Sequence, residues 1–169
     1  MPANIEIKAR VDDFNGLKKK AEQLSDTPCQ VISQEDTFFY CPNGRIKLRE
    51  LSPQRGQLVY YLRQDVTGPK HSEYKIFETD DPAKLKLILT DAFGVRGVIN
   101  KIRYLYIVGQ TRIHLDDVNG LGKFVELEVV LRPNQNDAEG QAIAESLMQK
   151  LGIIVEDLID TAYMDMMEK

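Results

Sequence analysis

The sequence has no tryptophan, only two cysteines, and no apolar run that approaches the length of a membrane span. Two cysteines, Cys29 and Cys41, are too few for a disulfide scaffold or for a zinc site made of cysteine alone. A membrane-spanning helix needs about 20 apolar residues. The N-terminus reaches charge at Glu6 without the apolar stretch of a signal peptide. We therefore expect a protein of the reducing cytoplasm that has no membrane partner.

Net positive charge is also absent, because 22 basic and 26 acidic side chains give a formal net charge of -4. Proteins that bind nucleic acid are usually basic overall, so nucleic acid is not an expected partner. The 169 residues are 43% hydrophobic and 28% charged, which is typical of a globular protein that buries a core. No linker or repeat divides the chain, and we expect residues 1–169 to form a single domain.

Apolar residues recur at helical spacing in four stretches of the chain, which predicts four helices. The second stretch follows Asp81-Pro82 and ends before Gly94, and the third ends before Gly152; these are typical start and stop signals. The four predicted helices cover residues 14–24, 82–93, 143–151 and 158–166.

Much of the remaining chain is rich in β-formers or alternates with a period of two. Asn43-Gly44 and Asn119-Gly120 are hairpin signals, and tight turns between long strands imply antiparallel pairing. The predicted strands cover residues 3–11, 30–41, 44–51, 57–66, 71–79, 96–108, 111–118 and 122–131.

Five of these strands alternate apolar residues with fully charged ones. In the first strand, Ile5 and Ile7 share one face while Glu6 and Lys8 share the other. A solvated sheet face is the ordinary explanation for any single strand. Five such strands together favour an α+β fold in which the sheet closes into a barrel, with charges in a shared lumen and helices over the apolar outer face.

Charges packed into one lumen repel each other unless a partner neutralises them. Arg and Lys together suit a polyphosphate, because Arg forks onto phosphate oxygens and Lys supplies a compact charge. Glu6, Asp116, Glu126 and Glu128 are hard oxygen ligands that suit Mg²⁺ or Mn²⁺. These residue types indicate metal-assisted chemistry at a phosphate or nucleotide site and leave the reaction open.

The charged strands also form an ordered series of motifs. The series comprises Ile5-Glu6-Ile7-Lys8, Gln34-Glu35-Asp36-Thr37-Phe38-Phe39, Gly44-Arg45-Ile46-Lys47-Leu48-Arg49, Tyr61-Leu62-Arg63, Lys101-x-Arg103, Arg112-x-His114-Leu115-Asp116 and Leu121-Gly122-x-Phe124-Val125-Glu126-Leu127-Glu128. In this order the motifs resemble the CYTH superfamily, also called the triphosphate tunnel metalloenzymes. The resemblance covers nearly the whole chain. It implies an eight-stranded antiparallel closed β-barrel with a triphosphate lying in its tunnel.

The resemblance also implies roles for particular residues. It implies that Glu6, Lys8 and Asp116 are catalytic residues. It also implies that a Mg²⁺ or Mn²⁺ ion is bound by Glu6, Glu126 and Glu128, with Asp116 close by. The cations expected to bind the triphosphate are Lys8, Arg45, Lys47, Arg49, Arg63, Lys75, Lys101, Arg103 and Arg112.

One position departs from the family pattern, because the first Glu of its Glu-x-Glu-x-Lys signature is Asn4 here. Asn offers a neutral oxygen but neither a charge nor a base. The family includes class IV adenylyl cyclases, thiamine triphosphatases and tripolyphosphatases. ATP, thiamine triphosphate and tripolyphosphate therefore all stay open as substrates, and so do hydrolysis and cyclic AMP formation. Asn4 also keeps open a non-catalytic protein that binds a triphosphate.

Three further features have structural readings that we prefer. His114 could be a general base, but a histidine paired with a neighbouring carboxylate is favoured. Glu35 and Asp36 are interpreted as strand-edge or hydrogen-bonding residues, although either could approach the lumen. The methionines near the C-terminus, Met164, Met166 and Met167, are interpreted as core or dimer contacts, which leaves a homodimer open.

Overall fold

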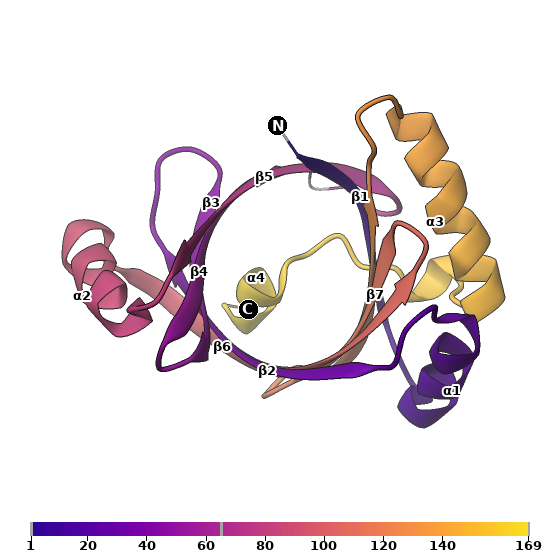
Figure 1. Ribbon diagram of the computed structural model, residues 1–169, viewed down its shortest axis with the longest axis horizontal. Helices are drawn as coiled ribbons and strands as arrows, with labels where there is room; N and C mark the ends of the chain where they lie inside the picture. The colour runs from indigo at the N-terminus through magenta and orange to yellow at the C-terminus, as the bar shows by residue number, and fades with distance from the viewer. Residues whose placement is uncertain (1, 65, 169) are drawn as a thin grey trace.

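The computed structural model describes residues 2–64 and 66–168, and its eight strands close into an antiparallel barrel (Figure 1). The order around the barrel is β1-β5-β4-β3-β2-β6-β7-β8. The strands are β1 (Ala3–Arg10), β2 (Gln30–Phe39), β3 (Arg45–Ser52), β4 (Arg55–Arg63), β5 (Lys70–Thr79), β6 (Val95–Val108), β7 (Thr111–Val118) and β8 (Gly122–Val130). This architecture confirms the predicted α+β fold with a closed barrel.

The predicted strands all form, with shifts only at their ends. Gly44 joins β2 to β3 with φ of +67°, and Gly120 joins β7 to β8 with φ of +80°. Glycine adopts these left-handed angles without steric cost, which explains both predicted hairpins. Residue 65, in the predicted strand 57–66, and residues 1 and 169 of the predicted domain lie outside the described residues.

Two of the predicted helices differ from the structure. The helices are α1 (Phe14–Leu24), α2 (Pro82–Phe93), α3 (Asp137–Leu151) and α4 (Tyr163–Met167), with a 3-10 turn η1 (Val155–Asp157) before α4. The third helix begins earlier than predicted because Asn136 and Glu139 form a capping box. The predicted helix 158–166 was wrong in its first half, where Leu158 instead forms a β-bridge with Ala9.

The hydrophobic core lies outside the barrel, between its outer face and the helices. Ile7 of β1 packs in one cluster with Phe14 of α1 and with Leu147 and Leu151 of α3. A smaller cluster joins Leu89 of α2 to the outer face of β2 and β3. Each fully buried side chain of this size contributes about 1.5–3 kcal/mol. The apolar faces predicted from alternation are therefore the outer faces of the barrel.

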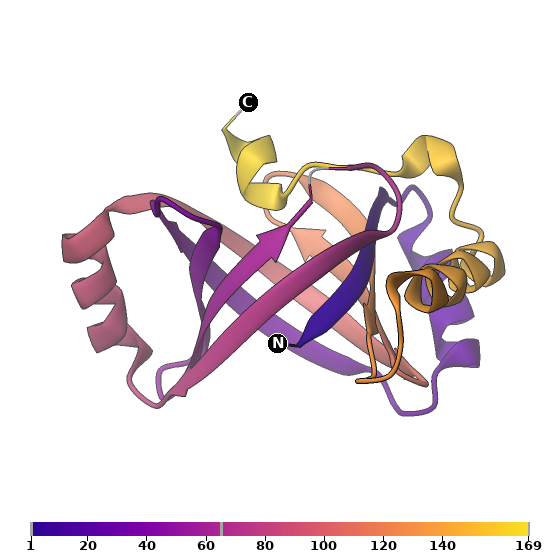
Figure 2. The ribbon, with the colours of Figure 1, turned by 90° about the horizontal axis from the view of Figure 1, so that it is seen from above.

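The described helices flank two sides of the barrel and cover only one of its two ends. Helices α1 and α3 cover one side, and α2 lies on the opposite side (Figure 1). The short helix α4 lies at one end of the barrel (Figure 2), so the C-terminal segment covers one mouth of the lumen. Within residues 2–64 and 66–168, no helix combines the length and the apolar character needed to cross a membrane.

Candidate functional site

The lumen of the barrel is a polar cavity of about 900 Å³. Alternate residues of all eight strands line it, because successive side chains of a strand point to opposite faces. Asn4, Glu6 and Lys8 come from β1, and Glu126 and Glu128 come from β8. The charged strand faces thus converge on one enclosed space.

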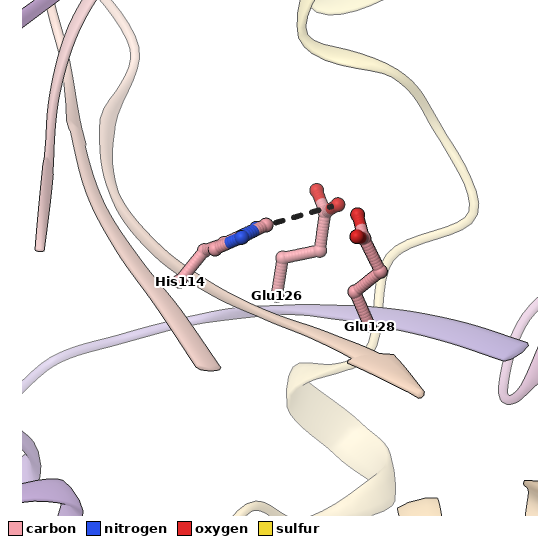
Figure 3. Close-up of side chains that lie close together, drawn as sticks. All are labelled: His114, Glu126 and Glu128. Atoms are coloured by element: carbon pink, nitrogen blue, oxygen red, sulfur yellow. Dashed lines mark ion pairs between the residues drawn. The ribbon is translucent and has the colours of Figure 1, made fainter. Parts of the chain in front are cut away.

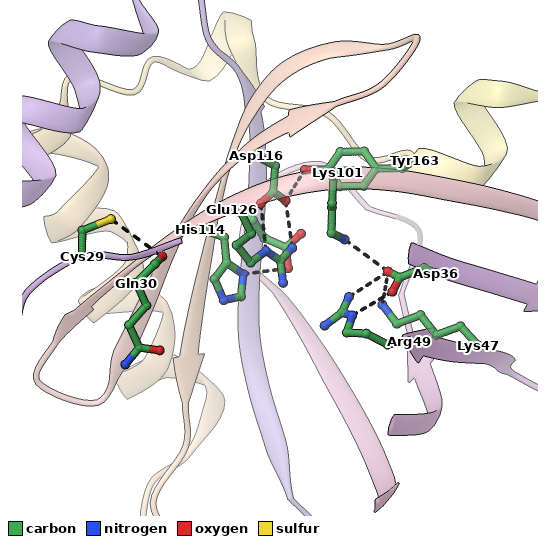
Figure 4. A network of polar contacts seen from close by, with 11 residues as sticks. Cys29, Gln30, Asp36, Lys47, Arg49, Lys101, His114, Asp116, Glu126 and Tyr163 are labelled. Carbon is green, nitrogen blue, oxygen red and sulfur yellow. Dashed lines mark hydrogen bonds and ion pairs between the residues drawn. The ribbon is translucent and has the colours of Figure 1, made fainter. Parts of the chain in front are cut away.

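Asp36 of β2 holds three cations at the middle of this space (Figure 4). Its carboxylate accepts two hydrogen bonds of 2.8 Å from Arg49 and lies 3.3 Å from Nζ of Lys101. Nζ of Lys47 lies 3.6 Å away. Burial alone would raise the pKa of Asp36. The neighbouring Arg49, Lys101 and Lys47 instead hold this pKa well below its ordinary value. Asp36 therefore stays charged and keeps these cations in place.

A second buried carboxylate, Asp116 of β7, is fully engaged by its neighbours. Nε and Nη2 of Arg103 each donate to it at 2.8 Å, and the hydroxyl of Tyr163 donates to it at 2.9 Å. Burial opposes ionisation, yet Arg103 holds the pKa of Asp116 below its ordinary value. Burial and Asp116 together raise the pKa of Tyr163. Because its oxygens are bonded to Arg103 and Tyr163, Asp116 is suited to positioning Arg103.

Helix α4 brings its own side chains to the covered end of the lumen. Nζ of Lys8 lies 3.9 Å from the centroid of the Tyr163 ring, which is a cation–π contact. Asp165, two residues further on, forms ion pairs with Arg45 of β3 and Arg96 of β6. Arg45, expected among the triphosphate-binding cations, thus contacts the helix that covers this mouth.

Among the described residues, several basic side chains in the lumen lack enough counter-charge or hydrogen-bond acceptors for their charged forms. Burial, together with neighbouring cations, lowers the pKa of Lys47 to about 7 and that of Lys101 to about 8. Arg63 of β4 has buried Nε and Nη2 atoms without a hydrogen-bond partner in the described part of the chain. A guanidinium does not lose its proton in proteins, so these donors are suited to an incoming anion.

Three potential metal ligands gather on the wall formed by β7 and β8 (Figure 3). One ligand atom from each of His114, Glu126 and Glu128 lies within 4.8 Å of the other two. Glu6 pairs with Glu128 in the register of β1 and β8. Burial, and then Glu126 and Glu128, raise the pKa of Glu6 to about 8. Carboxylates crowded in this way favour a divalent cation, so the donor set fits a metal.

Asn4 stands beside this group as a neutral neighbour. Its Nδ2 donates to Oε1 of Glu6 at 3.5 Å, while its Oδ1 is buried without a hydrogen-bond partner among residues 2–64 and 66–168. The amide therefore has an oxygen free toward the lumen but adds no negative charge.

The lumen changes character toward the end opposite α4. Phe38 of β2 packs with Tyr163, so residues earlier in β2 lie further from α4. There the neighbouring strands β3, β2 and β6 contribute apolar side chains to the cavity wall. We call these residues the apolar collar: Leu51, Ile32, Leu105 and Ile107. Arg112 of β7 pairs with Ile107 and gives this end a cation as well.

The register contradicts one expected lumen cation. Lys75 pairs with Tyr60 on the outer face of β5 and β4, while Tyr74 and Ile76 line the cavity. A shift of one residue reverses the facing of a strand side chain. Lys70 has the inward register instead: it pairs with Glu6, is 3% exposed, and donates to the carbonyl of Asp160 at 3.3 Å. Lys70 lies two residues before Ser72, which lines the cavity, so the same facing follows once the register of β5 is known.

The other expected cations that line the cavity are Lys8, Lys47, Arg49, Arg63, Lys101, Arg103 and Arg112. Sequence reasoning did not assign a site role to Asp36, which binds several of these cations, or to Tyr163, whose ring contacts Lys8 at the covered end of the lumen. It also preferred a structural role for His114, whose Nδ1 lies 3.9 Å from Oε1 of Glu126.

Comparisons with known proteins agree with this fold. Residues 2–163 match the CYTH domain. A Methanocaldococcus jannaschii protein, named as a candidate adenylate cyclase, is 26% identical over 172 residues, covering 96% of this chain and 97% of its own. A solved structure from Pyrococcus horikoshii OT3 superposes with a TM-score of 0.83 at 27% identity, covering 95% of this chain and 97% of that one.

A plant structure is more distant in sequence. It is a Hippeastrum protein described as a candidate adenylyl cyclase with a dominant triphosphatase activity. It superposes with a TM-score of 0.66 at 14% identity, covering 96% of this chain and 91% of that one. Likeness at this identity shows a shared fold alone.

Proposed function

This chain belongs to the CYTH domain family, and from that premise we propose that it carries out divalent-metal-dependent phosphate chemistry on a triphosphate bound in the barrel lumen. The observation that carries the proposal is that Nε and Nη2 of Arg63 have no hydrogen-bond partner among the described residues, in a cavity of about 900 Å³ lined by further buried cations. Phosphoryl transfer depends mainly on positioning and on charge neutralisation, which such a cavity supplies.

The contacts of the basic side chains suggest two different roles in binding a triphosphate. Arg49 and Arg103 are oriented by Asp36 and Asp116, so their remaining donors face a ligand from fixed positions. Lys47 and Arg63 are less constrained and can close on phosphate oxygens as these enter. A bound triphosphate offsets the repulsion among these cations, which is why a polyanion binds more favourably here than a neutral molecule.

A metal ion would be held by His114, Glu126 and Glu128, with Glu6 next to Glu128. When bound, Mg²⁺, Mn²⁺ or a related ion supplies charge neutralisation at phosphate oxygens. The chain's own residues fix where that charge lies, because all four come from adjacent strands of one rigid barrel wall.

The reaction has two forms that use the same cations. In hydrolysis, water attacks the terminal phosphorus. In cyclisation, the ribose 3′-hydroxyl of ATP attacks the α-phosphorus and pyrophosphate leaves. The M. jannaschii relative is named for the second reaction, and the Hippeastrum protein is described by a triphosphatase activity. The apolar collar favours a triphosphate with an organic group, such as ATP or thiamine triphosphate, over bare tripolyphosphate, since an inorganic chain gains nothing from apolar contacts.

The alternative is a protein that binds a triphosphate without turnover. Asn4 is the observation that supports it, since this buried amide supplies neither charge nor base beside Glu6.

One assay plate tests the proposal. The purified protein receives tripolyphosphate, thiamine triphosphate or ATP, each with Mg²⁺ or Mn²⁺, and phosphate, pyrophosphate and cyclic AMP are measured. We expect turnover of an organic triphosphate that is lost in Glu126→Gln. Arg63→Gln should weaken triphosphate binding, whereas Arg132→Gln, on the exposed surface, should not. Thermal stabilisation by a triphosphate without any turnover would establish the binding protein. If a triphosphate is neither turned over nor raises the melting temperature, both the enzyme and the binding protein are refuted.

A further inference from the structure

The potential metal ligands in the lumen include a histidine, His114, as well as the carboxylates Glu126 and Glu128. His114 is 4% exposed, and its Nδ1 is buried without a hydrogen-bond partner in the described part of the chain. The nearest carboxylate oxygen, Oε1 of Glu126, lies 3.9 Å away, which is too far for a hydrogen bond. Leaving a buried polar atom unpaired is unfavourable. The Nδ1 atom therefore has only a long contact with Glu126, and in the neutral imidazole a ring nitrogen is available to bind an ion.

The three side chains are arranged so that they can share one ion. His114 is directly opposite Glu126 in the register of β7 and β8, and Glu128 follows on the same face of β8. Their ligand atoms lie within 4.8 Å of one another (Figure 3). Nitrogen and oxygen ligands about 2.0–2.2 Å from a common ion lie at most about 4.4 Å apart. Small side-chain rotations are enough to bring the three onto one ion.

We infer that His114, Glu126 and Glu128 bind a divalent transition-metal ion through one nitrogen and two carboxylates, and that His114 makes this site select such an ion over Mg²⁺. The inference rests on the proposed function for the presence of a metal site and adds the class of metal. Mg²⁺ favours octahedral oxygen ligands and keeps several waters. Imidazole suits the later first-row ions, such as Co²⁺ and Zn²⁺.

The first test uses the unmodified protein, so it does not depend on the folding of a variant. The chain contains two histidines, His71 and His114. In metal-free protein labelled with ¹⁵N at histidine, added Zn²⁺ should shift an imidazole nitrogen of His114 at a lower Zn²⁺ concentration than any shift of His71. His71 is the internal comparison for surface binding, because its two nitrogens lie 2.8 Å from Asp137 and 3.7 Å from Glu73. A Zn²⁺ titration that shifts neither His114 nitrogen would overturn the inference.

The second test measures selectivity. Isothermal titration calorimetry of the metal-free protein gives affinities for Co²⁺ and Mg²⁺, with no triphosphate present. Later transition ions bind most sites more tightly than Mg²⁺, so the informative quantity is the ratio of the two affinities in variants. His114→Gln keeps a polar side chain but removes the nitrogen ligand, and it should lower the Co²⁺ affinity about tenfold or more. The Mg²⁺ affinity should change far less, and His71→Gln should alter neither.

The outcomes separate this inference from the proposed function. An unchanged Co²⁺ to Mg²⁺ ratio in His114→Gln, with metal-dependent turnover intact, would refute the role of His114 and leave the function standing. Selective Co²⁺ binding through His114 without any triphosphate turnover or binding would support the metal site and refute the function.

Discussion

Arg103 and Asp116 lie directly opposite each other on β6 and β7, and the guanidinium of one clasps the carboxylate of the other through two hydrogen bonds of 2.8 Å. Both side chains are buried, and Asp116 is 0% exposed. The pair fixes the direction of Arg103 in a lumen where an unrestrained arginine would have many conformations. In the proposed function Asp116 acts on the triphosphate through Arg103, as a positioning residue.

Asp116→Asn should destabilise the protein, because it leaves the buried charge of Arg103 without its counter-ion. Removal of one partner of a buried ion pair costs about 3–5 kcal/mol. We expect a change near the lower end of this range, since the other side of Arg103 faces the cavity. Urea denaturation measures it. Asp117→Asn, at the next and exposed position of β7, is the control, and equal midpoints for the two variants would contradict the argument.

Lys47→Ala should weaken the binding of metal-free tripolyphosphate, and Lys75→Ala should not. Lys47 lines the cavity 3.6 Å from Asp36, whereas Lys75 lies on the outer face. Loss of one direct phosphate contact by a cation is expected to lower the affinity about tenfold, which corresponds to about 1.4 kcal/mol. Calorimetry of both variants at equal ionic strength gives the comparison. If the two variants lost affinity equally, the assignment of faces in β5 would be refuted.

Alternation in the sequence was sufficient to predict which face of each strand is apolar, because strand geometry alone decides facing, whereas the closed eight-stranded barrel came from the family resemblance. Ile5 and Ile7 had to share one side, and Glu6 and Lys8 the other, whatever the rest of the chain did. The resemblance, and not the alternation, suggested Lys75 as a lumen cation, and there a difference of one residue in the register decides between lumen and surface. Local patterns therefore predict faces well where a strand has a clear apolar side, and poorly where it lacks one.

The cation-holding role of Asp36 and the contact of Tyr163 with Asp116 had no local signal in the sequence. Asp36 meets Arg49 and Lys101 only because β2 pairs with both β3 and β6. Tyr163 reaches Asp116 from a helix that follows all eight strands. Such contacts depend on long-range pairing, which spacing along a single chain does not encode. The expected pairing of His114 with a carboxylate was nearer to the structure, since Glu126 lies directly opposite it.

Asp165→Asn should loosen helix α4 over the mouth of the lumen while changing global stability little. Asp165 forms ion pairs with Arg45 and Arg96, and all three side chains are about one-quarter exposed. Partly exposed pairs contribute about 1 kcal/mol or less, so the expected effect is local opening. Limited proteolysis followed by mass spectrometry should show faster cleavage within residues 158–168. Glu156→Gln, exposed in η1, is the control, and identical cleavage rates in both variants would contradict an anchoring role.

The lowered pKa values of the lumen lysines predict that binding of a polyanion takes up protons. In the free protein the pKa of Lys47 is about 7 and that of Lys101 is about 8, against an ordinary value of 10.5. A bound triphosphate raises both, because it favours the charged form of each lysine. Above about pH 7 these lysines therefore hold more protons in the complex than in the free protein, so their contribution to affinity falls as pH rises from there. Well below pH 7 Lys47 is already protonated in both states and adds no further change.

Calorimetry at pH 8 in buffers of different ionisation enthalpy counts these protons for metal-free tripolyphosphate. Lys47→Met should remove most of one proton from the uptake, because a pKa of about 7 leaves this lysine mainly neutral at that pH in the free protein. Tripolyphosphate also changes its own protonation on binding, but this contribution is common to wild type and variant and cancels in the difference. Equal uptake by the two proteins would mean that Lys47 is already charged in the empty lumen, and that Asp36 alone offsets the repulsion from Arg49 and Lys101.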